Sequence, residues 1–371
     1  MTEYLDINGD GKIDVHDSIG LMQNQQTFNG GEALKSIVGN ALSNTLHTAP
    51  FPDTSQRYPF VSGDVVREYI FHKPHGLKDG APLVVWLHGD GGEVEYWVRY
   101  LAITDLADSV GFAVCFPQAK TIGSVLTSKS WVVGYPSQIN NPDVDLEQDV
   151  VFLDELTRHL QETYKLGDAF LKGFSTGGNM CFRMARAPGV ARFKAYSPVS
   201  AVDLTINHIG TPEKSPMFFV FGTEDEVWIY TGNPPPGTLS PANGIYPGIE
   251  ETFEFWCNNN VPNATVTEEA LPNVDTEDGS TVISYKCKDG DDSKEVWFYK
   301  IVGGIHEIPG SLTLVSNNQD IDAEEEAIKF FQKFNTQTPF DLENMELTSL
   351  KRRTPAVLRR KREAFSKLLF R

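Results

Sequence analysis

Short apolar runs, separated by longer mixed stretches, recur along the chain from about residue 61 onward. Four of these runs are mainly apolar: 82–88, 112–116, 169–173 and 216–221. Continuous apolar runs of this length are typical of strands in a parallel sheet whose two faces are both covered. The segment 65–71 alternates between apolar and polar residues instead, which predicts a strand with one exposed face.

Helical patterns lie between these runs. Residues 149–164 and 322–334 place apolar side chains at i, i+3 and i+4 spacing, which predicts two amphipathic helices. Two more strands are predicted at 281–286 and 295–302, on either side of an Asp-Gly-Asp-Asp turn. Strands that alternate with helices predict an α/β fold with a mostly parallel sheet and helices on both faces.

Changes of pattern divide the chain into four segments. They are a short acidic unit at 1–30, a linker with one helical patch at 31–60, an α/β domain at 61–336 and a basic tail at 337–371. The end of the tail, 350–371, contains nine Lys or Arg residues against one acidic residue. This segment is compatible with a helix that is solvated, docked on the protein itself, or bound to a membrane surface or a partner.

Composition narrows the class of protein. The 371 residues are 40% hydrophobic, so the chain can bury a large core. The formal net charge of −18 at pH 7 repels phosphate backbones, which makes nucleic acid an unsuitable partner. No apolar run is long enough for a transmembrane helix, and none is expected. The residues after Met1 lack the basic and apolar regions of a signal peptide, so none is expected there.

The most informative segment follows the apolar residues 169–171. It reads Gly173-Phe-Ser175-Thr-Gly177, and an amphipathic stretch comes next. A strand, a Gly-x-Ser-x-Gly turn and a helix form the context of a nucleophile elbow, in which a serine sits on a sharp, strained turn. Small residues two positions away avoid clashes there, and the helix start offers amides to a developing oxyanion. Ser175 is therefore the predicted nucleophile.

A serine needs a base at neutral pH, and the base needs a group that orients it. In α/β hydrolases the chain order is serine, acid and histidine, each on a loop after a strand. Only His208 and His306 lie beyond Ser175, and only His306 follows a predicted strand, in the loop Gly303-Gly-Ile-His-Glu-Ile-Pro-Gly. His306 is therefore the predicted base.

Several carboxylates compete for the position of the acid. Asp225 follows the apolar run 216–221 and lies between Glu224 and Glu226 on the same loop. Asp203 follows another strand-like segment and remains an alternative. The place after the strand that begins near residue 217 favours Asp225.

A second oxyanion donor is expected in the glycine-rich turn after His88, which reads Gly-Asp-Gly-Gly. The main-chain amide of Asp90 or Gly91, beside the amide of Thr176, would hold a negatively charged oxygen. The side chain of His88 is expected to brace this turn through hydrogen bonds and to take no part in the reaction.

Together these segments resemble the polyhydroxybutyrate depolymerase and feruloyl esterase type of α/β hydrolase, grouped as carbohydrate esterase family 1, over about residues 62–336. The matching segments are Leu87-His-Gly-Asp-Gly-Gly, Asp149-Val-Val-Phe-Leu, Gly173-Phe-Ser-Thr-Gly-Gly, Phe221-Gly-Thr-Glu-Asp-Glu-Val, Trp256-Cys-Asn-Asn-Asn and Gly303-Gly-Ile-His-Glu-Ile-Pro-Gly. Three departures leave the substrate open. Ile308 stands where the family has Trp, Asp90 stands where many depolymerases have Cys, and Cys257 directly follows Trp256.

The resemblance implies an α/β-hydrolase fold and a reaction without a cofactor. The site residues that it implies are Ser175 as nucleophile, Asp225 as acid and His306 as base. It also implies a disulfide between Cys257 and Cys287, and with it an extracellular location. The other two cysteines, Cys115 and Cys181, lie in apolar surroundings and are expected to be buried free thiols.

The acidic unit at 1–30 contains a second motif, which is EF-hand-like. Oxygen-bearing side chains at loop positions 1, 3, 5 and 12, with glycine at position 6, match a calcium loop. The predicted ligands are Asp6, Asn8, Asp10, Asp17 and the backbone carbonyl of Lys12. An aspartate at the last position resembles a dockerin repeat, which implies a cohesin-like partner, although dockerins carry two such loops and this chain has one.

These observations predict a serine esterase that works through an acyl-enzyme. The expected substrates are feruloyl or acetyl esters of plant cell-wall polysaccharide, with a polyester depolymerase or a general carboxylesterase as the alternative. A prediction of another class is a calcium-dependent binding or scaffold protein with an inactive hydrolase domain.

Overall fold

A computed structural model of the chain describes residues 56–346 with internal gaps. The described ranges are 56–92, 94, 97–98, 103–121, 129–204, 212–232, 246–290, 294–310 and 318–346. The predicted calcium loop, the helical patch of the linker and the basic end of the tail lie outside the described residues. Those three features stay predictions.

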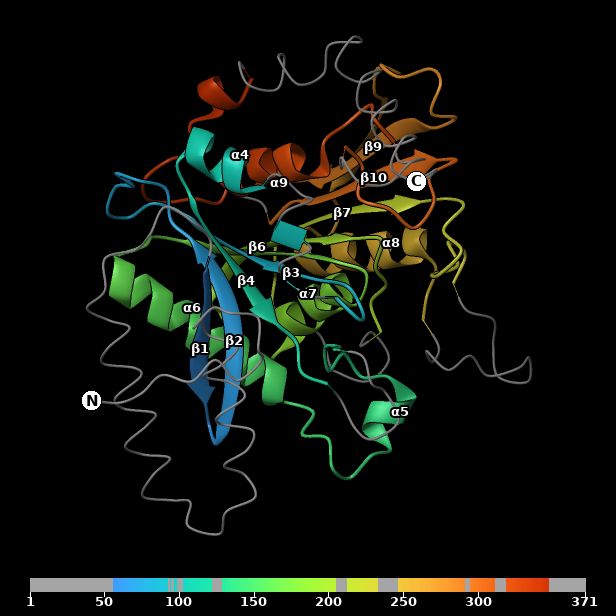
Figure 1. Ribbon diagram of the computed structural model, residues 1–371. Coiled ribbons are helices and arrows are strands. Elements are labelled where there is room, and N and C mark those ends of the chain that lie inside the picture. Colours follow the sequence, from blue (N-terminus) through green and yellow to red (C-terminus); the bar gives the residue numbers. More distant parts are fainter. Residues whose placement is uncertain are drawn as a thin grey trace, which may run out of the picture.

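One twisted sheet forms the centre of the molecule (Figure 1). Within the described residues its strands follow the order β1 (Gln56–Ser62), β2 (Val65–His72), β4 (Ala113–Gln118), β3 (Leu83–Leu87), β5 (Ala169–Phe174), β6 (Phe193–Val199), β7 (Met217–Gly222), β10 (Val296–Val302), β9 (Thr281–Lys288) and β8 (Thr265–Ala270). The central strands, from β4 to β10, pair in parallel. The two strands at each edge pair antiparallel.

Helices cover both faces of this sheet (Figure 1). They are α4 (Ile103–Val110), α5 (Pro136–Ile139), α6 (Gln148–Tyr164), α7 (Thr176–Arg186), α8 (Ile249–Asn260) and α9 (Ala323–Gln332). Helices α6, α7 and α8 share one hydrophobic core with one face, and α4 and α9 share a second core with the other face. This architecture is the α/β-hydrolase fold. None of the described helices is long and apolar enough to cross a membrane.

The hydrophobic pattern explains why these segments pair as they do. Every residue of β3, β4, β5 and β7 is buried, which confirms the strands predicted from the continuous apolar runs. Strand β2 has mixed burial up to Glu68 and is buried from Tyr69 onward. Helix α9 begins where the side chain of Asp322 accepts hydrogen bonds from the amides of Glu324 and Glu325, a typical N-cap.

The folded unit extends beyond both predicted boundaries of the α/β domain, 61 and 336. Strand β1 begins at Gln56, within the predicted linker, because its backbone pairs with β2 along its whole length. At the other end Phe340 and Met345 are buried in the core that contains α4 and α9. The ring of Phe340 lies 5.6 Å from that of Phe112. The first part of the predicted tail therefore belongs to the domain.

Candidate active site

Ser175 lies between the end of β5 and the first residue of α7, in a strained backbone conformation. Its φ of 54° and ψ of −122° are unusual for a residue with a side chain. Its amide donates a hydrogen bond of 2.9 Å to the carbonyl oxygen of Val199 on β6. A Cβ atom on Gly173 would overlap the carbonyl of Gly177, and one on Gly177 would overlap the carbonyl of Leu87. The turn thus requires the glycines of the Gly-x-Ser-x-Gly pattern.

His306 and Asp225 form a hydrogen-bonded pair on neighbouring loops. The Nδ1 atom of His306 lies 2.8 Å from Oδ2 of Asp225. The loops begin side by side because β10 and β7 pair in parallel, with Ile301 opposite Gly222. The imidazole ring also packs against Phe174, the residue before Ser175, with ring centroids 4.9 Å apart. The predicted nucleophile, acid and base therefore lie together at the carboxyl ends of β5, β7 and β10.

The second oxygen of Asp225 is held by the backbone of its own loop. Its Oδ1 atom accepts hydrogen bonds of 2.8 Å from the amides of Val227 and Trp228. The side chain of Asp225 is fully buried, whereas that of His306 is 13% exposed. A buried carboxylate with fixed amides on one oxygen can present the other oxygen to imidazole in a single orientation.

Asp203, the alternative acid, has different partners. Its carboxylate accepts hydrogen bonds of 2.8 and 3.0 Å from the guanidinium of Arg186 at the end of α7. The indole nitrogen of Trp256 donates a further hydrogen bond of 3.1 Å to the same carboxylate. The side chains of Asp203 and Arg186 are both fully buried. Asp203 is therefore part of a buried ion pair that anchors the end of α7.

The glycine-rich turn after β3 lies directly beside the nucleophile. A Cβ atom on Gly89 would lie 3.2 Å from that of Ser175. The amide of Gly91, one of the two predicted oxyanion donors, already donates to the carbonyl of Lys129. The amides of Asp90 and Thr176 make no hydrogen bond within the described part of the chain. Of the two candidates in this turn, Asp90 is therefore the one whose amide is available.

The side chain of His88 braces this turn, as predicted. Its Nδ1 atom lies 2.6 Å from the carbonyl oxygen of Gly89. Its Nε2 atom accepts hydrogen bonds from the amide of Ala119 and the side-chain amide of Gln118. Gln118 also donates to the carbonyl of Gly92, so one network fixes both ends of the turn.

Comparison with known proteins finds esterases similar in sequence to this chain. No protein-family model matches the chain. The chain is 26% identical over 271 residues to NocK of Nocardia uniformis subsp. tsuyamanensis, whose name describes it as an esterase, over 69% of this chain and 74% of that protein. It is 25% identical over 166 residues to the bifunctional acetylxylan esterase/xylanase XynS20E of Neocallimastix patriciarum, over 44% of this chain and 22% of that protein. The chain is a serine esterase.

Solved structures similar to this chain include two hydrolases. The acetyl xylan esterase from Aspergillus awamori has 15% sequence identity and a TM-score of 0.46, and the match covers 68% of this chain and 94% of that chain. The poly(3-hydroxybutyrate) depolymerase LpqC from Bordetella parapertussis has 16% identity and a TM-score of 0.38, over 47% of this chain and 67% of that chain.

The esterase has a buried glutamate beside the predicted base that sequence reasoning missed. The hydroxyl of Ser200 donates a hydrogen bond of 2.8 Å to the backbone carbonyl of Glu307, and it accepts one of 3.3 Å from the backbone amide of Glu307. Its Oε1 atom accepts a hydrogen bond of 3.0 Å from the amide of Asn318, and its Oε2 atom has no partner within the described residues. Burial raises the pKa of Glu307 to about 8, although the hydrogen bond from Asn318 opposes this. Burial thus favours the protonated form of Glu307, and the hydrogen bonds of this residue tie the loop of His306 to two other segments.

Sequence reasoning also missed an aromatic pair beside the loop that carries Asp225, which we call the acid loop. The ring of Tyr135, in the loop before α5, stacks on that of Trp228 with centroids 6.3 Å apart. Burial raises the pKa of Tyr135, and the nearby negative charge of Asp90 raises it further. Because the amide of Trp228 holds Asp225, this stack connects the acid loop to the side of the site where Asp90 lies.

The four cysteines are buried free thiols in this structure. This agrees with the prediction for Cys115 and Cys181, but the disulfide expected between Cys257 and Cys287 is not formed. The two thiols lie next to each other, and burial raises the pKa of both. Cys257 lies on α8 and Cys287 on β9, so the fold brings together the residues that the resemblance pairs.

Within the described residues, no group of three or more His, Cys, Asp or Glu side chains could hold a metal ion. The predicted calcium ligands, Asp6, Asn8, Asp10, Lys12 and Asp17, lie outside those residues.

Proposed function

We propose that Ser175, His306 and Asp225 are the catalytic residues of this esterase and act through an acyl-enzyme. Nε2 of His306 takes the proton of the Ser175 hydroxyl as its oxygen attacks the ester carbonyl. The proton then passes to the departing alcohol, and the acyl group remains on Ser175. A water molecule, deprotonated by the same imidazole, attacks the acyl-enzyme and releases the acid.

The observation that carries this proposal is the hydrogen bond between His306 and Asp225 beside the strained serine turn. With Nδ1–H bound to Asp225, the imidazole has Nε2 available as an acceptor for the serine proton. The positive charge that forms on the ring during attack is stabilised by the buried carboxylate. The amides of Thr176 and Asp90 are the proposed oxyanion donors, and neither has a competing acceptor in the described part of the chain.

Replacing the nucleophile tests the proposal most directly. We expect Ser175→Ala to lower turnover of p-nitrophenyl acetate by about 10³-fold or more, because only the oxyanion donors and substrate binding would remain. Labelling by a fluorophosphonate probe should disappear at the same time. Ser197→Ala is a matched control, because Ser197 is a buried serine on β6 whose hydroxyl has no partner in the described residues. Wild-type turnover in Ser175→Ala would contradict the assignment.

We propose acetyl or feruloyl esters of plant cell-wall polysaccharide as the substrates. The support is a similar protein named as an acetylxylan esterase, together with the family resemblance of the motifs. A polyester depolymerase or a general carboxylesterase is the second candidate, and a depolymerase among the similar structures is consistent with it. Acetylated xylan, methyl ferulate and a polyhydroxybutyrate film, assayed side by side, distinguish the candidates. Preference for the film would overturn the polysaccharide proposal.

We propose an extracellular location, because the motifs resemble those of an esterase family, and a cohesin-like partner, because residues 1–30 resemble a dockerin repeat. Affinity capture of the full chain on an immobilised cohesin domain, with and without calcium, tests the partner. Capture that is independent of calcium, or no capture, would contradict it.

A further inference from the structure

A small cleft lies at the end of the sheet opposite to the active site. It has a volume of about 160 Å³ and is bounded by Phe193, at the start of β6, by Pro216, just before β7, and by Ala185, in the last turn of α7. Ser175 follows the other end of this parallel sheet, at the carboxyl end of β5. A strand of six or seven residues spans about 20 Å, so the cleft is separate from the catalytic residues.

One wall of the cleft is apolar. Phe193 is buried, and Val190 and Ala185 lie beside it. Such a surface suits the hydrocarbon part of a small ligand, because removing apolar atoms from water is favourable. The volume is below that of typical sites for drug-sized molecules, which limits the ligand to a few carbon atoms or a single ring.

The hydroxyl of Tyr196 supplies a hydrogen-bond donor in this cleft. The side chain is 2% exposed and lines the cleft, yet its hydroxyl forms no hydrogen bond within the described residues. Burial raises the pKa of Tyr196, so the hydroxyl keeps its proton. Because the hydroxyl borders the cleft, it can donate to a ligand oxygen there; the carboxylate of Glu213, whose charge also raises this pKa, lies nearby.

Two lysines at the cleft have no ion-pair partner. Lys214 and Lys294 are exposed, and neither forms an ion pair within the described residues. A third lysine, Lys194, lies 3.9 Å from Asp168 and is partly neutralised by it. Glu213 is the one carboxylate of the lining. Positive charge therefore exceeds negative charge here, in a protein whose formal net charge is −18.

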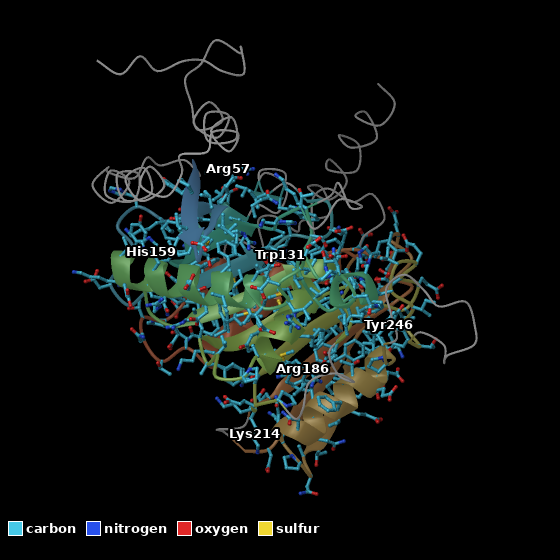
Figure 2. The ribbon with its side chains drawn as sticks, turned by 90° about the horizontal axis from the view of Figure 1, so that it is seen from below. Arg57, Trp131, His159, Arg186, Lys214 and Tyr246 are labelled. Carbon is cyan, nitrogen blue, oxygen red and sulfur yellow. The ribbon has the colours of Figure 1, made fainter. Side chains whose placement is uncertain are left out.

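These features meet on one side of the molecule. Figure 2 labels Lys214 and Arg186, the last residue of α7, in the same part of the view. A neutral hydroxyl donor, two ammonium groups without an ion-pair partner in the described part of the chain and an apolar wall are the features that recognise an anion with a hydrocarbon body.

We propose that this cleft binds a small organic carboxylate, with its hydrocarbon part on Phe193 and its carboxylate near Tyr196, Lys214 and Lys294. The carboxylate accepts a hydrogen bond from the Tyr196 hydroxyl and is attracted by the two ammonium groups. The site is non-catalytic and does not depend on the proposed ester chemistry, because none of its residues is part of the catalytic machinery.

Calorimetric titration of benzoate into the protein tests the proposal, because benzoate has no ester bond and is bound without being turned over. We expect Tyr196→Phe to weaken benzoate binding roughly fivefold, because it removes one hydrogen bond to a charged acceptor. The double variant Lys214→Gln with Lys294→Gln should weaken it roughly tenfold at low salt. Lys78→Gln is the matched control, an exposed lysine outside the cleft, and should leave binding within about twofold of the parent.

Two further ligands distinguish the contribution of the carboxylate charge from that of the hydrocarbon ring. Benzyl alcohol has the ring without the carboxylate, and inorganic phosphate has charge without the ring; both should bind more weakly than benzoate. Benzoate binding that the cleft variants leave unchanged would overturn the proposal, as would phosphate binding as tight as that of benzoate. Thermal unfolding of each variant shows that it is folded before the titration, and the double lysine variant changes only exposed side chains.

Discussion

Asp225 and Asp203 occupy similar places in the fold but have different partners. Each is a buried aspartate just after a central parallel strand, β7 for Asp225 and β6 for Asp203. Asp225 faces the imidazole of His306, with backbone amides on its other oxygen. Asp203 faces the guanidinium of Arg186 and the indole nitrogen of Trp256.

The difference lies in when the partner carries its charge. A guanidinium is always charged, so Asp203 is neutralised throughout the reaction and its interaction does not change as bonds break. In the proposed mechanism the imidazole gains a proton only while the serine attacks, so Asp225 would stabilise the charge that forms in the transition state. Position after a strand therefore does not distinguish the two carboxylates; the group that each carboxylate faces does.

Of these substitutions, Asp225→Asn should have the largest effect on turnover. An asparagine keeps the shape but removes the charge that stabilises the imidazolium, and it no longer fixes the imidazole tautomer. We expect turnover to fall by about 10³- to 10⁴-fold. Steady-state kinetics on p-nitrophenyl acetate measures the loss, and the unfolding curve of the variant serves as the control. A variant that retains a tenth of wild-type turnover would remove Asp225 from the proposed triad.

Asp203→Asn should affect stability instead. Arg186 would then be a buried cation without its counter-charge, which typically costs about 3–5 kcal/mol of unfolding free energy. Urea unfolding measures this loss. Turnover per folded molecule should stay within about threefold of wild type, because Asp203 does not contact the base. If Asp203→Asn lowers turnover more than Asp225→Asn, the two roles are reversed.

Glu307→Gln should change how the unfolding free energy depends on pH. The folded protein holds the proton of Glu307 up to a pH of about 8, whereas the ordinary pKa of glutamate is 4.5. Between these values the folded state binds more protons than the unfolded chain, so the unfolding free energy falls as pH rises and levels off above 8. The slope is at most about 1.4 kcal/mol per pH unit.

Urea unfolding of wild type and Glu307→Gln at about pH 5 and about pH 8 measures this dependence. The variant cannot ionise at this position, so it should lose less stability between the two pH values. Glu251→Gln is the matched control, since Glu251 is an exposed glutamate. The same pH dependence in wild type and Glu307→Gln would show that Glu307 is ionised in the folded protein.

Much of the central sheet could be predicted because its strands are apolar on both faces. Residues 83–87 are a run of this kind, and every one of them is buried. The edge strand β8 could not be found in this way, because all six of its residues, Thr-Val-Thr-Glu-Glu-Ala, are exposed. The core position of Phe340 was missed for a related reason: it depends on contact with a distant ring, that of Phe112.

The candidate site could be predicted where a residue has a local signature. The glycines around Ser175 are required by the turn itself, and His306 was found by elimination along the chain. The partners of Asp203 and Glu307 have no such signature. Arg186 is 17 residues from Asp203, and Asn318 is 11 residues from Glu307. Which side chains meet at these positions depends on the packing of the whole sheet and its helices.

A third set of carboxylates is predicted to bind a metal ion. Removing this ion should have the smallest effect on catalysis. Asp6, Asp10 and Asp17 bring negative charges into one short predicted loop, together with the oxygen of Asn8. Their repulsion would be relieved by calcium rather than by imidazole or guanidinium. We expect a calcium chelator to speed limited proteolysis within residues 1–30 and to leave esterase turnover nearly unchanged, because serine chemistry needs no metal. Equal cleavage with and without chelator would show that the loop binds no calcium, and loss of turnover on chelation would show that the metal supports the catalytic domain.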